Sequence, residues 1–522
     1  MIKLLDCTLR DGGYVNDWNF GKKTINSVLQ SLVNSGIDII ECGFISQEKE
    51  TTDDKSVYTN VDFYIPESEG NVKFAAMINF GEFNPNDLLP KSKSRLDIIR
   101  VAFHKADFEK AVSYCDEISN KGYAVFLQPM NAMDYSEEEY KRLIELANRS
   151  TISVFYLVDT FGNMRKSDLV RLYSLIDTNL RKDIPIGFHS HNNMQLSFSN
   201  AQELIARHGD RDILIDSSIF GMGRGAGNLC TELMTQYLNE NLGTRYNLLP
   251  ILECIDDSIM PIYLSHSWGY SVPYYLAAIN SCHPNYANYL VSMQTLCVKD
   301  INIIIKSIPA DKKAKFDKEL IKQMYVDYLS RNIDDSETLK DLALLCKGRK
   351  VLLLAPGKSL VTNYDLVKGY IAKYNPVVFS INHIPKKYKF DKIFISNLKR
   401  FKNVDDSLNS IDEKVLYTSN ITVQKSHVLN YSSYLNDEDS IFDNSGLMLI
   451  NILRKAGVLE FALAGYDGFD YVGGQNYYDN KLVGGGVPYE QQVRINEAMK
   501  KYFKRIQKEV NIAFVTPSKY AN

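Results

Sequence analysis

Short apolar runs alternate with longer amphipathic segments through about the first 240 residues of the chain. The runs are rich in Ile, Val, Leu and Phe, which is typical of buried β-strands. The predicted strands are Ile2–Asp6, Asp38–Phe44, Val72–Ile78, Leu96–Phe103, Tyr123–Pro129, Ile152–Asp159, Ile184–His189 and Ile213–Phe220. The segments between them predict the helices Lys22–Ser35, Lys105–Lys121, Ser136–Asn148, Lys166–Asp177, Leu196–His208 and Asn228–Glu240.

This alternation predicts an α/β fold, with a (β/α)8 TIM barrel over residues 1–244. A doubly wound open sheet is the alternative. Polar residues gather where the predicted strands end, and barrel enzymes place their active sites on that face. These residues are Arg10, Asp11, Glu41, Gln128, Asp159, Thr160, His189 and His191.

Two histidines separated by one residue end the seventh predicted strand. Alternate side chains of a strand point to the same face, so His189 and His191 project together. Converging imidazoles are good metal ligands, and Asp11 after the first strand offers a carboxylate. A surface strand with two incidental histidines is the alternative, but the chain has only 8 histidines, and the two motifs together favour a metal site.

A glycine-rich loop, Gly221 to Gly227, follows the eighth predicted strand and precedes Asn228. Its glycines allow close backbone approach to a ligand. The spacing is not that of a dinucleotide-binding loop. Asn228 is either a metal ligand through its carbonyl oxygen or the N-cap of the next helix.

Composition narrows the function classes. The chain has 522 residues, and its 60 basic and 63 acidic residues give a net charge of −3, which does not favour nucleic acid as a partner. The 8 cysteines are scattered and form no CxxC pair, which indicates reduced thiols. We find neither a signal peptide nor an apolar stretch long enough to span a membrane, and we expect a cytoplasmic protein.

The stretches Thr8–Gly12, His189–Asn192 and Gly221–Glu232 together resemble the DRE-TIM metallolyase superfamily, which includes 3-hydroxy-3-methylglutaryl-CoA lyase, isopropylmalate synthase and 4-hydroxy-2-oxovalerate aldolase. The resemblance covers about residues 1–330. It implies a divalent metal on Asp11, His189 and His191, with Asn228 as a fourth ligand. Mn²⁺ or Mg²⁺ suits this set, with Zn²⁺ or Co²⁺ as alternatives. It also implies that Arg10 stabilises an enolate.

Within the superfamily the aldolase branch matches best, which implies pyruvate or another 2-oxo acid plus an aldehyde as substrates, and a homo-oligomer. These aldolases carry a histidine as base where this chain has Tyr14. A metal-bound hydroxide, Tyr14 or His266 could take that role. Tyr270 or Tyr274 is a candidate to line the site from above. The alternatives are a Claisen-type synthase that condenses acetyl-CoA with a 2-oxo acid, and a non-catalytic binding barrel.

The remaining residues are divided into a helical extension (245–332), a polar linker (333–348) and a Rossmann-like α/β domain (349–522). The last domain resembles, more distantly, the bacterial sialyltransferase-like and motility-accessory-factor-type fold. That resemblance implies a nucleotide or nucleotide-sugar partner in surface-polysaccharide biosynthesis, and a bifunctional aldolase–transferase is the further alternative. The residues implied in binding are Gly357, Ser359, Asn382 and Ser445.

Overall fold

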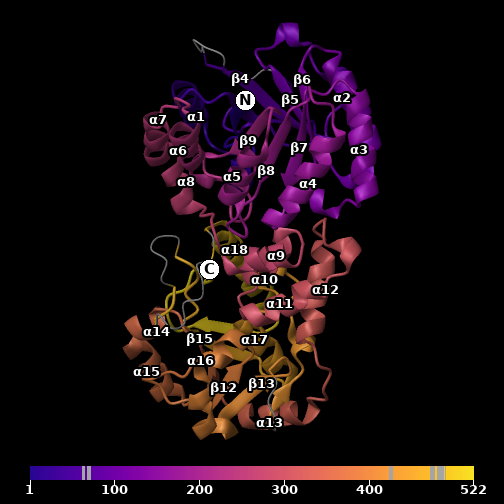
Figure 1. The fold of residues 1–522 in the computed structure, drawn as a ribbon. Coiled ribbons are helices and arrows are strands. Elements are labelled where there is room, and N and C mark those ends of the chain that lie inside the picture. Colours follow the sequence, from indigo (N-terminus) through magenta and orange to yellow (C-terminus); the bar gives the residue numbers. More distant parts are fainter. Residues whose placement is uncertain are drawn as a thin grey trace. The chain divides into compact units, whose positions relative to one another are not determined.

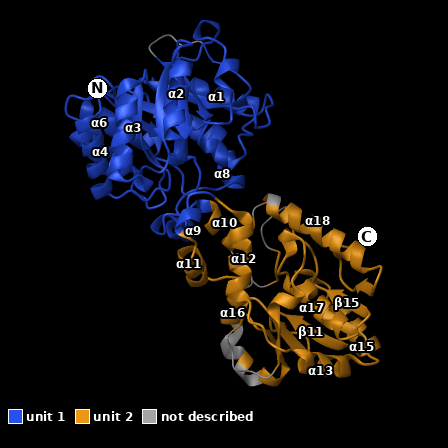
Figure 2. Cartoon of the chain, turned by 90° about the vertical axis from the view of Figure 1, so that its right-hand side faces the viewer, with its two compact units in different colours: residues 1–284, 310–315 blue, residues 285–309, 316–522 orange. Residues whose placement is uncertain are grey.

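The computed structural model describes residues 1–60, 65–66, 72–421, 427–470, 476–478, 487 and 489–521. The chain divides into two compact units (Figure 2). Unit 1 comprises residues 1–284 and 310–315, and unit 2 comprises residues 285–309 and 316–522.

Eight parallel strands of unit 1 close into a barrel within the described residues (Figure 1). β1 pairs with β9 on one side and with β2 on the other, where Leu5 lies opposite Ile39. A short strand, β3 (Val57–Tyr58), lies beside β2. The barrel is therefore confirmed and the open sheet is wrong. Its strands are β1 (Ile2–Asp6), β2 (Ile39–Ile45), β4 (Lys73–Asn79), β5 (Ile98–Phe103), β6 (Ala124–Pro129), β7 (Val154–Asp159), β8 (Ile186–Ser190) and β9 (Ile213–Ser217).

Helices connect the strands at the predicted places. They are α1 (Lys22–Asn34), α2 (Phe108–Ser119), α3 (Glu137–Arg149), α4 (Lys166–Asn179), α5 (Ser197–Arg207) and α6 (Thr231–Leu242). The last strand ends earlier than expected, because a 3-10 turn, η6 (Ile219–Gly221), opens the glycine-rich loop. α6 begins after Cys230, its N-cap, so the prediction of Asn228 as N-cap is wrong.

Strand alternation divides the barrel into an outer and an inner layer. Ile40, Ile99 and Ile215 belong to the large apolar cluster between strands and helices. Their neighbours Ile39, Ile98 and Leu214 belong to a smaller cluster inside the barrel. One step further along β2, β5 and β9, the same inner face carries Glu41, Arg100 and Asp216. The interior is thus apolar at one level and charged at the next, toward the carboxyl ends of the strands.

The sheet of unit 2 is also parallel, in the order β14-β13-β12-β11-β10-β15-β16. Successive strands step outward from β10 to β14, and β15 and β16 then lie on the other side of β10. The strands are β10 (Val351–Leu354), β11 (Val377–Ile381), β12 (Lys392–Ile395), β13 (Val415–Thr418), β14 (Val428–Leu429), β15 (Glu460–Ala464) and β16 (Asn511–Phe514). The helices that follow them are α14 (Ser359–Thr362), α15 (Tyr364–Tyr374), α16 (Leu398–Leu408), α17 (Ser445–Lys455) and α18 (Tyr489–Ile506).

The expected helical extension is shared between the two units. α7 (Leu249–Cys254), the π-helical turn η7 (Ile255–Ile259), α8 (Met260–Ser265) and α9 (Val272–Ile279) belong to unit 1. α10 (Pro284–Ser292), α11 (Val298–Lys306) and α12 (Lys318–Leu329) lie in unit 2 apart from Pro284. The expected linker, residues 333–348, instead contains α13 (Ser336–Cys346), because Thr338, Leu342 and Cys346 give it a buried face.

A buried carboxylate explains why α11 and α12 pack with the second sheet. Asp443 Oδ2 accepts hydrogen bonds from Thr295 (2.5 Å), which precedes α11, and from Tyr325 of α12 (2.5 Å). The hydroxyl of Tyr431, which follows β14, lies 3.4 Å from the same oxygen. Three separate segments of unit 2 are therefore joined at one atom.

Replacing this acceptor should destabilise unit 2. Asp443→Ala removes the acceptor shared by buried hydroxyls, and we expect it to lower the free energy of unfolding by about 3 kcal/mol, measured by urea denaturation. Asp443→Asn keeps a carbonyl oxygen in place and should cost about 1 kcal/mol or less. Equal losses in the two variants would show that the acceptor is not what matters.

Candidate metal centre

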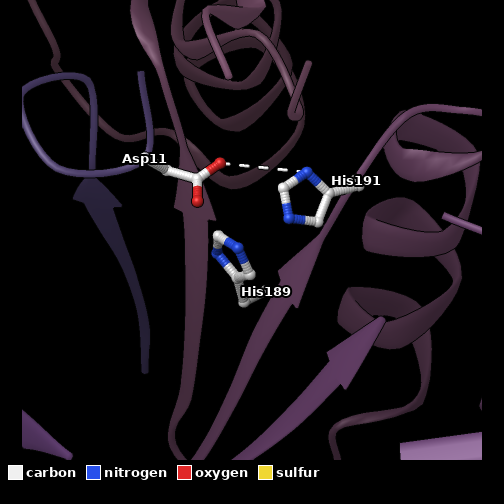
Figure 3. Close-up of side chains that lie close together, drawn as sticks. All are labelled: Asp11, His189 and His191. Carbon is white, nitrogen blue, oxygen red and sulfur yellow. Dashed lines mark ion pairs between the residues drawn. The ribbon is translucent and has the colours of Figure 1, made fainter. Parts of the chain in front are cut away.

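Asp11, His189 and His191 form a buried cluster whose ligand atoms all lie within 4.8 Å of one another. Asp11 is fixed by the turn after β1, where the N–H groups of Arg10 and Asp11 both donate to the carbonyl oxygen of Cys7. His189 lies in β8 and His191 follows it, as the alternation predicted. Figure 3 shows the carboxylate and both imidazoles facing one another.

The orientation of His189 is set from behind by Asp216. The Nδ1–H group of His189 donates to Asp216 Oδ2 at 2.9 Å, which leaves Nε2 for a metal. Tyr156 donates to the other oxygen of Asp216 at 2.8 Å and holds that carboxylate in place. A carboxylate behind a histidine is the usual outer support of a metal ligand.

His191 and Asn228 carry buried atoms that fit a metal. Among the described residues, Nδ1 of His191 and Oδ1 of Asn228 have no hydrogen-bond partner. The same His191 nitrogen lies 3.8 Å from Asp11 Oδ2. Burial lowers the pKa of His191 to about 3, so the imidazole is neutral and able to coordinate. Asn228 donates through Nδ2 to Asp11 Oδ2 at 2.7 Å, which places its amide at the edge of the cluster.

The glycine-rich loop makes this close approach sterically feasible. A Cβ at Gly223 would lie 2.4 Å from Nδ2 of Asn228 and 2.9 Å from Asp11 Oδ2, so only glycine fits there. The loop is fixed to the turn after β8, where the N–H of Asn192 donates to the Gly227 carbonyl at 2.7 Å. Asn193 adds a side-chain hydrogen bond from the N–H of Ala226 at 2.8 Å.

A chain of ion pairs connects the cluster across the barrel. Arg10 contacts Asp11 Oδ1 through Nη1 (2.5 Å) and Glu41 Oε2 through Nε (2.8 Å). Arg100 contacts the same Glu41 oxygen (2.7 Å) and also pairs with Asp216. Burial alone would raise the pKa of Asp11, but Arg10 and the two histidines hold it well below its usual value.

The charges of this network leave room for a divalent cation. Asp11, Glu41 and Asp216 supply three negative charges, and Arg10 and Arg100 supply two positive ones. One negative charge is therefore left over in a buried site, which is costly without a counter-charge. A divalent cation on this donor set would leave one positive charge, which suits an anionic substrate.

Part of unit 1 is similar to known proteins. Residues 89–255 match the family model described as HMGL-like. Unit 1 thus contains an HMGL-like domain. The chain is 23% identical over 276 residues to a 4-hydroxy-2-oxovalerate aldolase of Geobacillus genomosp. 3, which covers 50% of this chain and 77% of the relative. It is also 23% identical over 240 residues to an oxaloacetate decarboxylase of Mycobacterium tuberculosis, covering 45% of this chain and 69% of the relative.

Among solved structures, the N-terminal domain of a putative aldolase from Bacteroides vulgatus is 28% identical, with a TM-score of 0.49, over 56% of this chain and 96% of that one. The match to the HMGL-like family model and the aldolase relatives confirm the resemblance to the metallolyase superfamily. None of the helices among the described residues combines the length and apolar character needed to cross a bilayer.

Of the other candidates in unit 1, Tyr14 is near enough to the charge network for Asp11 and Arg10 to act on its pKa. Its side chain is 40% exposed, and desolvation raises its pKa above the usual 10, so it keeps its proton at neutral pH. His266 bonds Ser265, and Tyr270 is 57% exposed. In the described part of the chain neither residue makes a hydrogen bond, ion pair or ring contact with Asp11, His189 or His191.

The four candidates of unit 2 make internal contacts at the carboxyl edge of its sheet. Asn382, with φ +56°, donates to Ser445 Oγ at 2.6 Å and accepts from the Ser396 N–H at 3.0 Å. Gly357 donates through its N–H to the Gly465 carbonyl at 3.1 Å. The Ser359 N–H donates to Asp467 at 2.8 Å.

Arg100 and Asp216 were not predicted as site residues. Each is a single charged residue within an otherwise apolar strand, in Ile98–Phe103 and Ile213–Ser217. A single charged residue in a buried strand nearly always has a partner, and this was the signal by which the sequence could have indicated the two residues.

The support of His189 by Asp216 can be tested through metal affinity. Asp216→Asn keeps a hydrogen-bond acceptor but removes the charge, and we expect Mn²⁺ binding to weaken by about 10- to 100-fold in calorimetric titration. Asp177→Asn on α4 is the matched control, because it removes the carboxylate partner of another buried residue, Arg211. It should bind Mn²⁺ as the wild type does. Unchanged affinity in Asp216→Asn would contradict the assignment.

Proposed function

We propose that the barrel is a divalent-metal-dependent aldolase or lyase that makes or breaks a C–C bond through a pyruvate-type enolate. The observation that carries this proposal is the Asp11–His189–His191 cluster with the guanidinium of Arg10 fixed beside it. The names of the relatives support it, since 4-hydroxy-2-oxovalerate aldolase and oxaloacetate decarboxylase both act on a bond next to a 2-oxo acid. We expect Mn²⁺ or Mg²⁺ as the metal.

Arg10 is the chain's own group for the developing negative charge. Its hydrogen bonds to other described residues use Nε and Nη1, which leaves Nη2 to donate to a substrate oxygen. Because Glu41 and Asp11 fix the guanidinium of Arg10 on two sides, its Nη2 donor is in place before negative charge develops on the substrate oxygen. A bound divalent cation would supply Lewis acidity toward the ketone oxygen of the 2-oxo acid.

Tyr14 fits an acid rather than a base. A phenol whose pKa lies above 10 cannot accept a substrate proton efficiently at neutral pH. It can donate a hydrogen bond to the aldehyde oxygen, which becomes an alkoxide when the C–C bond forms. We therefore assign Tyr14 to the aldehyde oxygen and not to the methyl group of pyruvate.

Proton exchange at the methyl group of pyruvate tests enolate formation without any aldehyde. With Mn²⁺ or Mg²⁺ bound, the wild type should exchange these protons with D₂O, followed by NMR. Arg10→Gln should slow exchange by roughly 10²- to 10³-fold, because it removes a preorganised donor. His189→Ala should abolish it.

Arg171→Gln, an exposed arginine on α4, is the control for loss of a positive charge and should exchange at the wild-type rate. Absence of exchange in the wild type would contradict the aldolase proposal. Release of free CoA from acetyl-CoA and a 2-oxo acid, followed with a thiol reagent, would instead indicate the Claisen-type synthase.

We further propose that unit 2 binds a nucleotide or nucleotide sugar at the carboxyl edge of its sheet, in surface-polysaccharide biosynthesis. The support is topological, because the strand order reverses between β10 and β15, and ligands of such sheets bind at that point. Ser445, at the start of α17, lies at this edge beside Asn382 and Ser396.

Calorimetric titration with cytidine mono- and diphosphate tests this second proposal. We expect millimolar or tighter binding to the wild type and about ten-fold weaker binding to Ser445→Ala, which lacks one hydroxyl partner. Ser307→Ala at the end of α11 is the control, since its hydroxyl bonds only its own helix among the described residues. Absence of binding to the wild type would overturn the proposal.

A further inference from the structure

Arg224 lies in the glycine-rich loop, four residues before Asn228, and is half-buried. Its guanidinium carbon is 5.3 Å from the centre of the Tyr14 ring. Its Nη1 lies 3.4 Å from Nε2 of His283. The side chain is therefore held between two neutral groups at the carboxyl end of the barrel.

Arg224 differs from the fully buried arginines of unit 1 in its partners. Arg10, Arg100 and Arg211 each pair with at least one carboxylate. In the described part of the chain Arg224 makes no ion pair, and its neighbours are an aromatic ring and an imidazole. A guanidinium held in place without a counter-charge is suited to bind an anion from outside the chain.

Two titratable side chains, His283 and His104, lie near Arg224. Burial lowers the pKa of His283 to about 3, and the charge of Arg224 adds to this effect. His104 also has a lowered pKa, with burial as the main cause and Lys315 and Arg224 contributing. Asp107 acts in the opposite direction on His104. Both imidazoles are therefore uncharged at neutral pH, and neither supplies a counter-charge to Arg224.

Arg224 is also close to the metal cluster. Its charge is one of those acting on His191, and the Tyr14 ring that it covers feels the charges of Asp11 and Arg10. Gly223, the residue before Arg224, is so close to the cluster that a Cβ there would lie 2.9 Å from Asp11 Oδ2. Arg224 therefore lies at the same end of the barrel as the candidate metal ligands.

We propose that Arg224 binds a carboxylate or phosphate on the aldehyde substrate, at the end away from the reacting carbonyl. This inference rests on the proposed aldolase function, in which the metal and Arg10 bind the 2-oxo acid. The planar guanidinium of Arg224 can donate to two oxygens of either anion, so the test uses both a carboxylate and a phosphate. The aldehyde is then an anionic one, such as a semialdehyde acid or a sugar phosphate.

Anion binding can be measured without catalysis. The chain has 2 tryptophans, and each contacts a residue that lies against Arg224 or just before its loop. Trp18 packs on Tyr14 at 4.8 Å, and Trp268 donates to the carbonyl of Phe220, which precedes the loop. Fluorescence titration of the metal-loaded protein with succinate and with inorganic phosphate, at constant ionic strength, should saturate for at least one anion.

Arg224→Gln should weaken this binding by roughly 10- to 100-fold, since it removes a charge-assisted hydrogen-bond donor. Arg224→Lys keeps the positive charge but not the planar guanidinium, and its anion affinity should lie between those of the wild type and Arg224→Gln. Arg171→Gln on α4 is the matched control and should bind as the wild type does. Absence of saturable binding in the wild type, or equal binding in Arg224→Gln, would overturn the inference.

Matched aldehydes then test the role in catalysis. With pyruvate, we compare succinic semialdehyde with butanal and glyceraldehyde 3-phosphate with glyceraldehyde, measuring kcat/KM for each. The wild type should prefer the anionic member of at least one pair, and Arg224→Gln should reduce that preference by about ten-fold or more. An unchanged preference would contradict the assignment.

The two proposals fail in different ways. If the wild type does not exchange the protons of pyruvate, the aldolase proposal fails. If Arg224→Gln then still weakens anion binding, the anion site stands. If exchange occurs but Arg224→Gln alters neither anion binding nor aldehyde preference, the aldolase proposal stands and this inference is wrong.

Discussion

The pairing of buried charges inside the barrel is the constraint on which the site depends. Glu41 accepts from both Arg10 and Arg100, and Arg100 in turn pairs with Asp216. In an interior of low dielectric constant, removing any one member would leave an unpaired charge. The network therefore fixes the position of Arg10 at one end and of His189, through Asp216, at the other. The proposed substrate-binding and metal-binding groups are held by the same interaction.

Small residues make room for this polar level of the barrel. A Cβ at Gly187 would lie 2.3 Å from the ring of Tyr156, so glycine in β8 allows Tyr156 to reach Asp216. Gly223 plays the same part for Asn228 and Asp11 on the other side of the cluster. At these two positions glycine thus leaves room beside the charged groups and the candidate metal ligands, where a larger side chain would clash.

Strand periodicity was enough to predict the barrel and the convergence of His189 with His191, because both follow from a repeat of two residues. Asp11 was predictable from its place after β1. Asp216 and Arg100 could be noticed only as lone charges in buried strands, because their partners depend on the register between strands that are distant in sequence. For Asn228 the structure was needed, because the observed start of α6 after Cys230 excludes the N-cap, and the ligand role stays a prediction.

Charge pairing also distinguishes two candidate anion sites, the turn before α14 and the loop that carries Arg224. The turn before α14 resembles a phosphate-binding turn, but Asp467 already accepts the N–H and hydroxyl of Ser359, so an internal anion occupies the place where a phosphate would bind. Any nucleotide at this edge must therefore bind beyond the turn or displace Asp467. At Arg224 the situation is the reverse, because a fixed cation has only neutral neighbours in direct contact among the described residues. A site for an external anion is indicated by a charge that the chain itself leaves unpaired, and by this criterion Arg224 is the stronger candidate.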